Sequence, residues 1–320
     1  MSKLLFVVHR YFPYPGGSEY FVQWMAEECL KRGHDVTVLS HTHKGDQNGV
    51  KVTSDYQILG NQKWDLIIVH GGDCVSQNVV HENAFIINRL SPVLYMIIKP
   101  SESPVCINGL KHHRFLGYST DVDIQFLQYT QLESKARRVT HGIVPEHTQM
   151  SKTTKNAGKF VVVSAGGFYP HKAMTPLAEA WPKIVITSDI QLHLYGYGET
   201  HLAPPDSPNV FIHKDKSKDE VMQAIADADV YVMNSTEEGF GLVLLEAMVN
   251  RTPWFARDIA GATMLKKHGT IYKDEEDLIK KLMEYKVDDK KIEDAYNYAM
   301  SRFTIQETVN DIENVLLECM

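Results

Sequence analysis

The feature that most constrains the fold of this chain is a series of short, continuously apolar runs that alternate with helical segments. Residues 4–8, 36–39, 66–69 and 93–98 are such runs in the first half of the chain. Between the first two, residues 19–32 carry apolar side chains at helical spacing, and Gly33 follows as a stop. Runs without polar alternation are typical of strands that are covered on both faces. The pattern therefore predicts an α/β fold with parallel sheets.

The second half of the chain repeats this pattern after a polar segment. Residues 146–159 are rich in polar residues and helix breakers, and new strands are expected at residues 160–164, 191–195, 210–213, 230–233 and 253–256. A length of 320 residues suits two domains. We predict an N-terminal Rossmann-like domain (1–145), a linker (146–159) and a C-terminal Rossmann-like domain (160–302). Residues 303–320 are expected to form a C-terminal helix that can pack back on the N-terminal domain. Two doubly wound domains of this kind would face each other across a ligand cleft.

Composition excludes several classes of protein. A net charge of −7 argues against a nucleic-acid partner. No apolar run reaches the roughly 18–20 residues of a membrane span, so no integral membrane span is expected. The four cysteines are scattered without a Cys-x-x-Cys pair, and the N-terminus lacks a secretory cleavage site, which favours a cytoplasmic location. A homodimer is left open.

The strongest chemical signal lies in residues 235–248, where Glu238 and Glu246 flank a glycine-rich turn and the start of a helix. Gly239 and Gly241 let a backbone approach a ligand closely, and a helix N-terminus attracts an anion. A carboxylate accepts two hydrogen bonds, which suits the vicinal diol of a sugar or a ribose. The alternative is an acidic residue that favours the helix dipole, followed by a solvated helix glutamate. The glycine context favours the binding interpretation.

This Glu-x7-Glu element, headed by Glu-Gly-Phe-Gly, resembles the signature of the family 4 retaining glycosyltransferases, which have the GT-B fold. Other segments are similar to motifs of the same family, in the same order along the chain. They are residues 15–19 (Pro-Gly-Gly-Ser-Glu), 32–39 (Arg-Gly-His-Asp-Val-Thr-Val-Leu), 65–70 (Asp-Leu-Ile-Ile-Val-His), 196–198 (Gly-Tyr-Gly), 228–230 (Ala-Asp-Val) and 252–253 (Thr-Pro).

The resemblance implies that a hexose of mannose or glucose type is transferred from a GDP- or UDP-linked sugar, with retention at the anomeric carbon. The acceptor would be a hydroxyl of a glycan, a glycoprotein or another molecule. Glu238 would hold donor-sugar hydroxyls and Glu246 the ribose hydroxyls. The remaining donor contacts would come from Gly16, Gly17, Gly166, Gly196, Gly198, His213, Phe240, Gly241, Leu242 and Val243. No cofactor beyond the donor and no metal are implied.

A second signal, residues 164–172, is a strand that ends in glycines and is followed by Lys172. In the family this turn supplies an arginine and, five residues later, a lysine, both directed at the diphosphate. Lys172 matches the lysine, but Gly167 stands at the arginine position. Losing one charge-assisted hydrogen bond costs about 1.5–3 kcal/mol unless it is replaced. Arg10, Lys99 and Arg257 are the candidate replacements.

His70 ends an apolar run, and a side chain at the carboxyl end of a parallel strand reaches the ligand crevice. It could orient an acceptor or a phosphate, or it could be a hydrogen-bonded structural histidine, and both interpretations stay open. A further family histidine, expected at the end of the strand at residues 93–98, is replaced by Ile98 or Lys99.

We expect front-face transfer, in which the leaving phosphate takes the proton of the acceptor and Lys172 stabilises the leaving group. This scheme needs no side-chain nucleophile. Two alternatives stay open: a GT-B epimerase or phosphorylase, and a non-catalytic nucleotide-sugar-binding or partner protein of the same fold. Turnover of the donor separates the enzyme from the binding protein.

Overall fold

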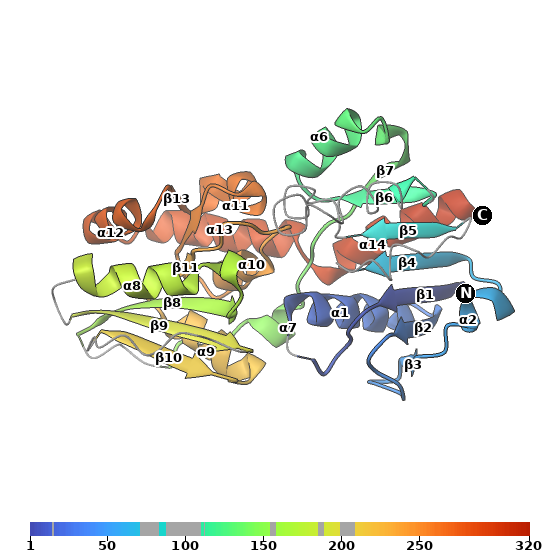
Figure 1. Ribbon diagram of the computed structural model, residues 1–320, viewed down its shortest axis with the longest axis horizontal. Helices are drawn as coiled ribbons and strands as arrows, with labels where there is room; N and C mark the ends of the chain where they lie inside the picture. Colours follow the sequence, from blue (N-terminus) through green and yellow to red (C-terminus); the bar gives the residue numbers. More distant parts are fainter. Residues whose placement is uncertain are drawn as a thin grey trace. The chain divides into compact units, whose positions relative to one another are not determined.

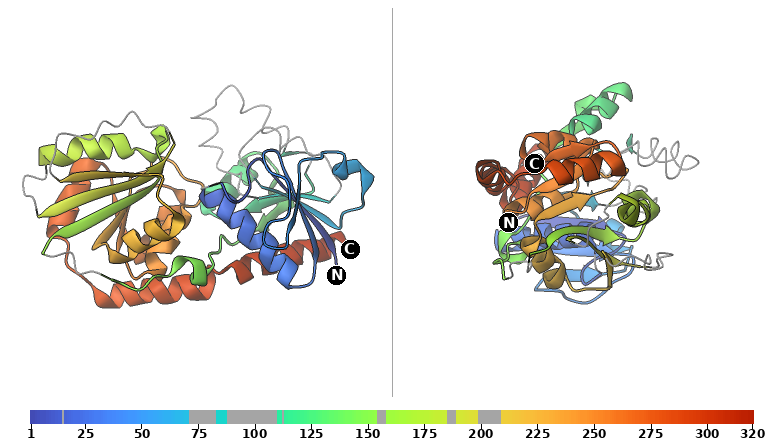
Figure 2. Two further views of the ribbon diagram at one scale, coloured as in Figure 1. Left: turned by 90° about the horizontal axis from the view of Figure 1, so that it is seen from below. Right: turned by 90° about the vertical axis from the view of Figure 1, so that its left-hand side faces the viewer.

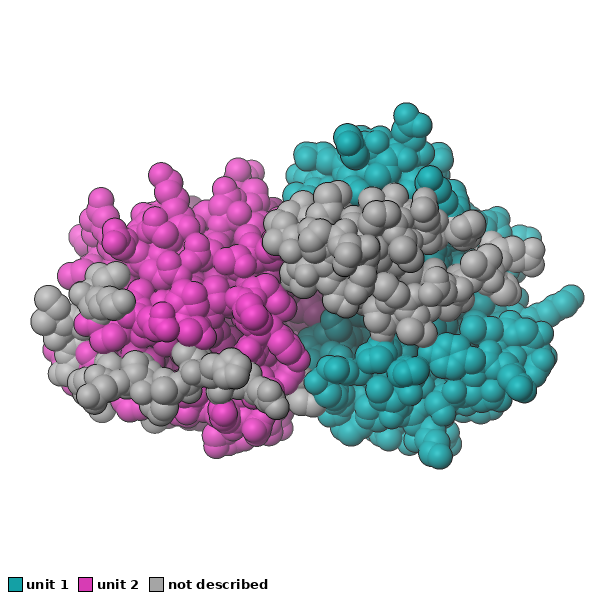
Figure 3. Space-filling view, in the orientation of Figure 1, with its two compact units in different colours: residues 1–142, 303–320 teal, residues 143–302 magenta. Residues whose placement is uncertain are grey.

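The computed structural model describes residues 1–14, 16–70, 83–87, 110–111, 113–153, 158–184, 189–198 and 209–320. These residues form two parallel β-sheets with helices on both faces of each sheet (Figures 1 and 2). The chain divides into two compact units (Figure 3). Unit 1 comprises residues 1–142 and 303–320, and unit 2 comprises residues 143–302. The predicted α/β class with two Rossmann-like parallel-sheet domains is confirmed.

The described strands of unit 1 form one parallel sheet in the order β3-β2-β1-β4-β5-β6-β7. Their bounds are β1 (Lys3–Val8), β2 (Asp35–Ser40), β3 (Lys51–Thr53), β4 (Leu66–His70), β5 (Ala84–Ile87), β6 (Phe115–Tyr118) and β7 (Ala136–Arg138). The central strands β1 and β4 are almost entirely buried, which explains why they read as continuous apolar runs.

Helices cover both faces of this sheet. Those of the described residues are α1 (Gly17–Lys31), α2 (Ile58–Asn61), α6 (Asp121–Tyr129) and α14 (Ile305–Cys319), with a 3₁₀ turn at Glu133–Lys135. Ile58 and Trp64 near α2 and Phe126 of α6 pack against Leu5 and Ile67 in one core cluster. Helix α1 instead packs against α14.

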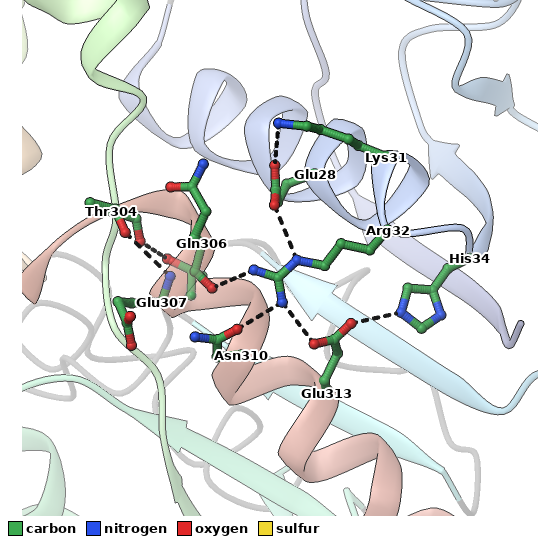
Figure 4. A network of polar contacts seen from close by, with 10 residues as sticks. Glu28, Lys31, Arg32, His34, Thr304, Gln306, Glu307, Asn310 and Glu313 are labelled. Atoms are coloured by element: carbon green, nitrogen blue, oxygen red, sulfur yellow. Dashed lines mark hydrogen bonds and ion pairs between the residues drawn. The ribbon is translucent and has the colours of Figure 1, made fainter.

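Arg32, which directly follows α1, fastens that helix to α14 (Figure 4). Its guanidinium donates to Glu28 at 3.1 Å, to Glu313 at 2.7 Å, to Asn310 at 2.8 Å and to the carbonyl of Gln306 at 3.0 Å. Helix α14 begins where the sequence indicates, because Thr304 Oγ1 accepts from the N–H of Glu307 at 3.4 Å. Residues 303–320 therefore complete unit 1.

The described strands of unit 2 form a second parallel sheet in the order β10-β9-β8-β11-β12-β13. Their bounds are β8 (Phe160–Gly167), β9 (Ile190–Tyr197), β10 (Val210–Lys214), β11 (Val230–Met233), β12 (Trp254–Arg257) and β13 (Thr270–Tyr272). Trp181 of α8 and Leu278 of α12 pack with Val162, Leu192 and Val230 on one face of the sheet.

The helices of unit 2 lie on both sides of the sheet (Figure 2). Within the described residues they are α7 (Pro145–Thr148), α8 (Met174–Ile184), α9 (Lys218–Asp227), α10 (Leu242–Val249), α11 (Ala260–Leu265), α12 (Glu275–Glu284) and α13 (Asp289–Arg302), with 3₁₀ turns at Pro170–Lys172 and Lys266–His268. Helix α9 contacts β8, and α10 packs against α9 and α13.

The segment predicted as a linker (146–159) contains most of α7, and the division between the units falls at residues 142 and 143. This segment is fastened to unit 2, because the N–H of Met150 donates to Asn250 Oδ1 and Asn250 Nδ2 donates to the carbonyl of Thr148, both at 2.7 Å. The strand expected at residues 93–98 lies outside the described residues, as do Ile98 and Lys99.

Candidate functional site

The order of strands in the second sheet reverses between β8 and β11. Ligands of doubly wound sheets bind outside the carboxyl ends of the strands at such a point. Strand β8 ends at Gly167 and β11 ends at Met233, and the loops that follow them carry Lys172 and Glu238. The topology therefore places these two side chains at the position in unit 2 where a ligand is expected.

Lys172 and Glu238 form an ion pair between Nζ and Oε1. Ser235 Oγ donates to the same carboxylate oxygen at 3.0 Å. The two loops are also joined through their backbones, because the N–H of Thr236 donates to the carbonyl of His171 at 2.9 Å. Within the described part of the chain, no hydrogen bond reaches Oε2 of Glu238. This oxygen can accept from a ligand hydroxyl without disturbing the lysine.

Glu246 forms a second lysine–carboxylate pair at the same end of the sheet. Its Oε1 pairs with Nζ of Lys218, and the side chains are only 8% and 19% exposed respectively. Glu246 is the fifth residue of α10, a helix that is otherwise apolar. Among the described residues its Oε2 also accepts no hydrogen bond. Both glutamates of the motif therefore have one oxygen held by a lysine and one oxygen without a described partner.

Gly241 sets the start of α10. Its φ of +85° is in the left-handed region, and a Cβ at this position would lie 3.2 Å from Met233 Sδ. The helix begins immediately after it, at Leu242. The first N–H groups of a helix have no partner within the helix, and together with the positive end of the dipole they attract an anion. Phe240, Gly241, Leu242 and Val243 form this turn.

The turn after β8 has an aromatic side chain in the space over Gly167. A Cβ at residue 167 would lie 2.3 Å from Cε2 of Tyr169. Tyr169 is 39% exposed, and its ring stacks on His171 with the ring centroids 5.8 Å apart. Burial, followed by the nearby Lys172 ammonium, lowers the pKa of His171. Gly166, with a φ of +154°, lets the backbone pass close to the Lys172 side chain.

Arg257, one of the proposed substitutes for the missing arginine, is already engaged within unit 2. Arg257 is held by Glu275 at 2.5 Å, by the carbonyl of Lys273 at 3.0 Å and by Asn234 at 3.2 Å. Arg10 belongs to unit 1 and donates to the hydroxyl of Tyr14 at 2.6 Å. Lys99 lies outside the described residues. Arg257 is thus engaged in fixing the strand ends of unit 2.

The two glycines after β9 have different reasons to be glycine. A Cβ on Gly196 would lie 2.4 Å from the ring of Phe168, whereas Gly198 has a φ of +88°. His213, predicted near the base of the nucleotide, lies on β10 in a row of rings. Its Nε2 is 3.0 Å from His193 Nδ1, and its ring stacks on Tyr195 at 4.3 Å. Its described contacts are thus with this sheet face and not with the two lysine–glutamate pairs.

His70 belongs to unit 1, at the carboxyl end of β4 beside the reversal of that sheet between β1 and β4. It is buried, and its ring centroid is 5.8 Å from that of Phe21. The other side of Phe21 stacks on His141 at 4.9 Å. Burial, with a smaller contribution from His70, lowers the pKa of His141 to about 3. The surroundings of His70 are those of a buried aromatic cluster.

Gly16 and Gly17 begin α1 in unit 1. Gly16 is the N-cap residue, and a Cβ on it would lie 2.1 Å from Oε2 of Glu19. The carboxylate of Glu19 therefore folds over the space that a side chain at residue 16 would take. Burial raises the pKa of Glu19. Pro15 and residues 71–82 lie outside the described part of the chain.

Sequence reasoning missed three residues of this site: Lys218, Ser235 and Tyr169. The Ser-x-x-Glu capping box at residues 217–220 indicates a helix that begins at Lys218. The pairing of Lys218 with Glu246, 28 residues away, depends on the packing of α9 against α10 and has no local signature.

The described residues contain no group of three or more His, Cys, Asp or Glu side chains that could hold a metal ion. None of their helices is long and apolar enough to cross a membrane.

Residues 159–286 match the family described as Glycosyl transferases group 1. This range covers most of unit 2, including both lysine–glutamate pairs. The chain therefore carries the domain of a glycosyltransferase enzyme. No curated protein sequence matches the chain at a significant level.

Solved structures with the same fold cover nearly the whole chain. HepE of Anabaena, in complex with UDP and glucose, has a TM-score of 0.77 at 15% identity, covering 99% of this chain and 100% of its own. Sucrose-phosphate synthase of Thermosynechococcus elongatus has a TM-score of 0.82 at 13% identity, covering 99% of both chains. The trehalose-phosphate synthase of Burkholderia xenovorans, in complex with glucose-6-phosphate, has a TM-score of 0.78 at 11% identity, covering 100% of both chains. The fold is thus GT-B.

Proposed function

We propose that this protein transfers a hexose from a nucleoside diphosphate sugar to a hydroxyl group of an acceptor, with retention at the anomeric carbon and without a metal ion. The observation that carries the proposal is the pair of lysine–glutamate contacts beside the start of α10, at the reversal point of the second sheet. A donor of this class offers a diphosphate, a ribose diol and sugar hydroxyls. The site offers cations and helix N–H groups for the first of these and carboxylates for the other two.

The charges of the site suit a leaving diphosphate. When the bond between the anomeric carbon and the phosphate oxygen breaks, negative charge grows on that oxygen. The Lys172 ammonium and the N-terminus of α10 are preorganised groups that favour such charge. The acceptor oxygen forms the new bond on the same face of the sugar, and its proton passes to the departing phosphate oxygen. No protein nucleophile is needed for this balance.

The two glutamates would have separate tasks. Glu238, held by Lys172 and Ser235, would accept from hydroxyls of the donor sugar. Glu246 would accept from the ribose hydroxyls. His70, Gly16 and Gly17 belong to unit 1 and are proposed to act toward the acceptor and the diphosphate.

The donor is proposed to be a UDP-linked hexose. The structural neighbour HepE binds UDP-glucose, which supports this choice over GDP-mannose. The acceptor is proposed to be a glycan, a glycoprotein or another hydroxyl compound, and the protein is proposed to act in the cytoplasm.

Calorimetric titration tests the proposal directly. We expect micromolar binding of one donor among UDP-glucose, UDP-galactose, UDP-N-acetylglucosamine and GDP-mannose in metal-free buffer, and loss of that binding in Glu246→Ala. Release of the nucleoside diphosphate on adding an acceptor, abolished in Glu238→Ala, would identify an enzyme. Donor binding without any release would instead favour a non-catalytic nucleotide-sugar-binding protein.

A further inference from the structure

Lys218 is the first residue of α9, and a capping box fixes its place. Ser217 Oγ accepts from the N–H of Glu220 at 3.2 Å, and Glu220 Oε2 accepts from the N–H of Ser217 at 2.9 Å. Burial of Met222, Ile225 and Ala226 then holds the helix against the sheet. The Cα of Lys218 is therefore rigidly positioned relative to β10 and β11.

The helix itself gains nothing from a lysine at this position. The N-terminal end of a helix carries a partial positive charge, so a cation there is unfavourable and an acid is favourable. The next two residues, Asp219 and Glu220, follow that rule. The dipole of α9 therefore does not explain a lysine in the first turn. Its ammonium instead forms an ion pair with Oε1 of Glu246.

Glu246 would likewise be unfavourable in its position without Lys218. It is the one charged side chain of α10, and it is nearly buried. A carboxylate in such a position needs a partner, because water no longer solvates it fully. The pair as a whole places a hydrogen-bond donor and an acceptor side by side on the edge of the candidate site.

Because of this arrangement, we propose that Lys218 is a ribose-binding residue that acts together with Glu246. The inference rests on the proposed function, since it requires a nucleotide at this site. Of the two ribose hydroxyls, one donates to the Glu246 carboxylate and the oxygen of the other accepts from the Lys218 ammonium. The pair thus recognises a vicinal diol as a unit, and a nucleotide without the diol loses both of these hydrogen bonds.

The segment just before α9 provides a matched control. Lys216 lies two residues earlier and also pairs with a glutamate, since its Nζ donates to Glu220 Oε1 at 3.0 Å. That pair is exposed to solvent, with 41% and 51% of the two side chains accessible. Lys216→Met removes the same charge two residues earlier in the chain without touching Glu246.

The test is calorimetric binding of UDP, GDP and their 2′,3′-dideoxy analogues to the wild-type protein, Lys218→Met, Lys218→Arg and Lys216→Met. We expect Lys218→Met to weaken binding of the better ribonucleotide by about 10-fold or more, and Lys216→Met by less than about 2-fold. The preference of the wild type for the ribonucleotide over its dideoxy analogue should shrink in Lys218→Met and persist in Lys218→Arg. Because this preference is a ratio within one variant, a loss of stability does not imitate it.

Failure of this inference can be distinguished from failure of the proposed function. One contrary result is that Lys218→Met binds the ribonucleotide as tightly as the wild type does, and another is that it weakens binding of the ribonucleotide and of its dideoxy analogue by the same factor. In either case Lys218 does not contact the ribose, and the inference fails while the proposed function stands. If the wild-type protein binds neither UDP nor GDP, the proposed function fails and the inference fails with it.

Discussion

The ring of Tyr169 occupies the space over Gly167, so that a Cβ at residue 167 would lie only 2.3 Å from Tyr169 Cε2. The position of the tyrosine ring therefore depends on the absence of a side chain at residue 167. A larger residue at 167 requires the ring of Tyr169 to leave its contacts with His171 and Tyr197. In the proposed donor site, an exposed aromatic face stands where the resembling family has a cation.

This relationship predicts that an arginine cannot simply be restored. Gly167→Arg alone should lower the free energy of unfolding by about 1–3 kcal/mol, because it overpacks the turn. Gly167→Arg combined with Tyr169→Ala should accept the new side chain and bind UDP about 10-fold more tightly than Tyr169→Ala alone, through one added charge-assisted hydrogen bond. Calorimetry and thermal unfolding check both statements. A stable Gly167→Arg protein with stronger binding would show that Tyr169 does not block the position.

A second prediction separates the two glutamates. Glu238→Gln keeps the shape of the side chain and removes the charge that pairs with Lys172. We expect kcat to fall by roughly 100-fold, because a donor sugar held in the wrong geometry reacts slowly, while the Kd of UDP changes by less than about 2-fold. Glu246→Gln should show the opposite pattern.

Initial rates with a UDP-sugar and calorimetry with UDP give the two quantities. Ser235→Ala serves as the graded control, since it removes one 3.0 Å hydrogen bond from Glu238 and leaves the ion pair. Its kcat should lie between those of the wild type and Glu238→Gln. Equal losses of UDP binding in both glutamate variants would contradict the division of roles.

A third prediction concerns the attachment of the last helix to unit 1 (Figure 4). Arg32, 22% exposed, donates to two carboxylates, one amide and one backbone carbonyl that lie on α1 and α14. Arg32→Met should lower the free energy of unfolding by about 2 kcal/mol, because its hydrogen bonds to the two carboxylates, the amide and the carbonyl are lost.

Lys31→Met is the matched control. Lys31 also pairs with Glu28, at 3.7 Å, but its side chain is 76% exposed, and such a pair contributes less than about 0.5 kcal/mol. Urea unfolding of both variants compares the two effects. Similar losses in the two variants would show that the buried part of the network adds nothing to the attachment of α14.

The sequence predicted the architecture well where hydrophobic burial alone decides it. Strands such as β4 and β11 are covered on both faces, and their apolar runs mark them directly. The start of α10 could also be predicted from the sequence, because the left-handed conformation of Gly241 requires glycine. Contacts between residues far apart in the chain could not be predicted. Lys218 meets Glu246, and Tyr169 covers Gly167, only because the packing of helices and turns brings them together.

The buried cluster around Phe21 leads to the last prediction, which concerns pH. His141 is fully enclosed and stacks on Phe21, and burial lowers its pKa from the usual 6.5 to about 3. Its folded-state pKa is thus below its unfolded value, so the unfolded chain binds the proton more tightly. The free energy of unfolding must then fall as the pH drops below 6.5, and this loss continues until about pH 3. At pH 5 the contribution of this one group is about 2 kcal/mol.

His141→Gln removes the titrating group and keeps a polar side chain. Urea unfolding at pH 7.5 and pH 5 should give a difference between the two pH values that is about 2 kcal/mol smaller than in the wild type, whatever the variant costs at neutral pH. His41→Gln is the control, because it makes the same substitution at an exposed histidine of the same unit. If His141→Gln retains the full pH dependence of the wild type, His141 takes up its proton without unfolding and the cluster is open to water.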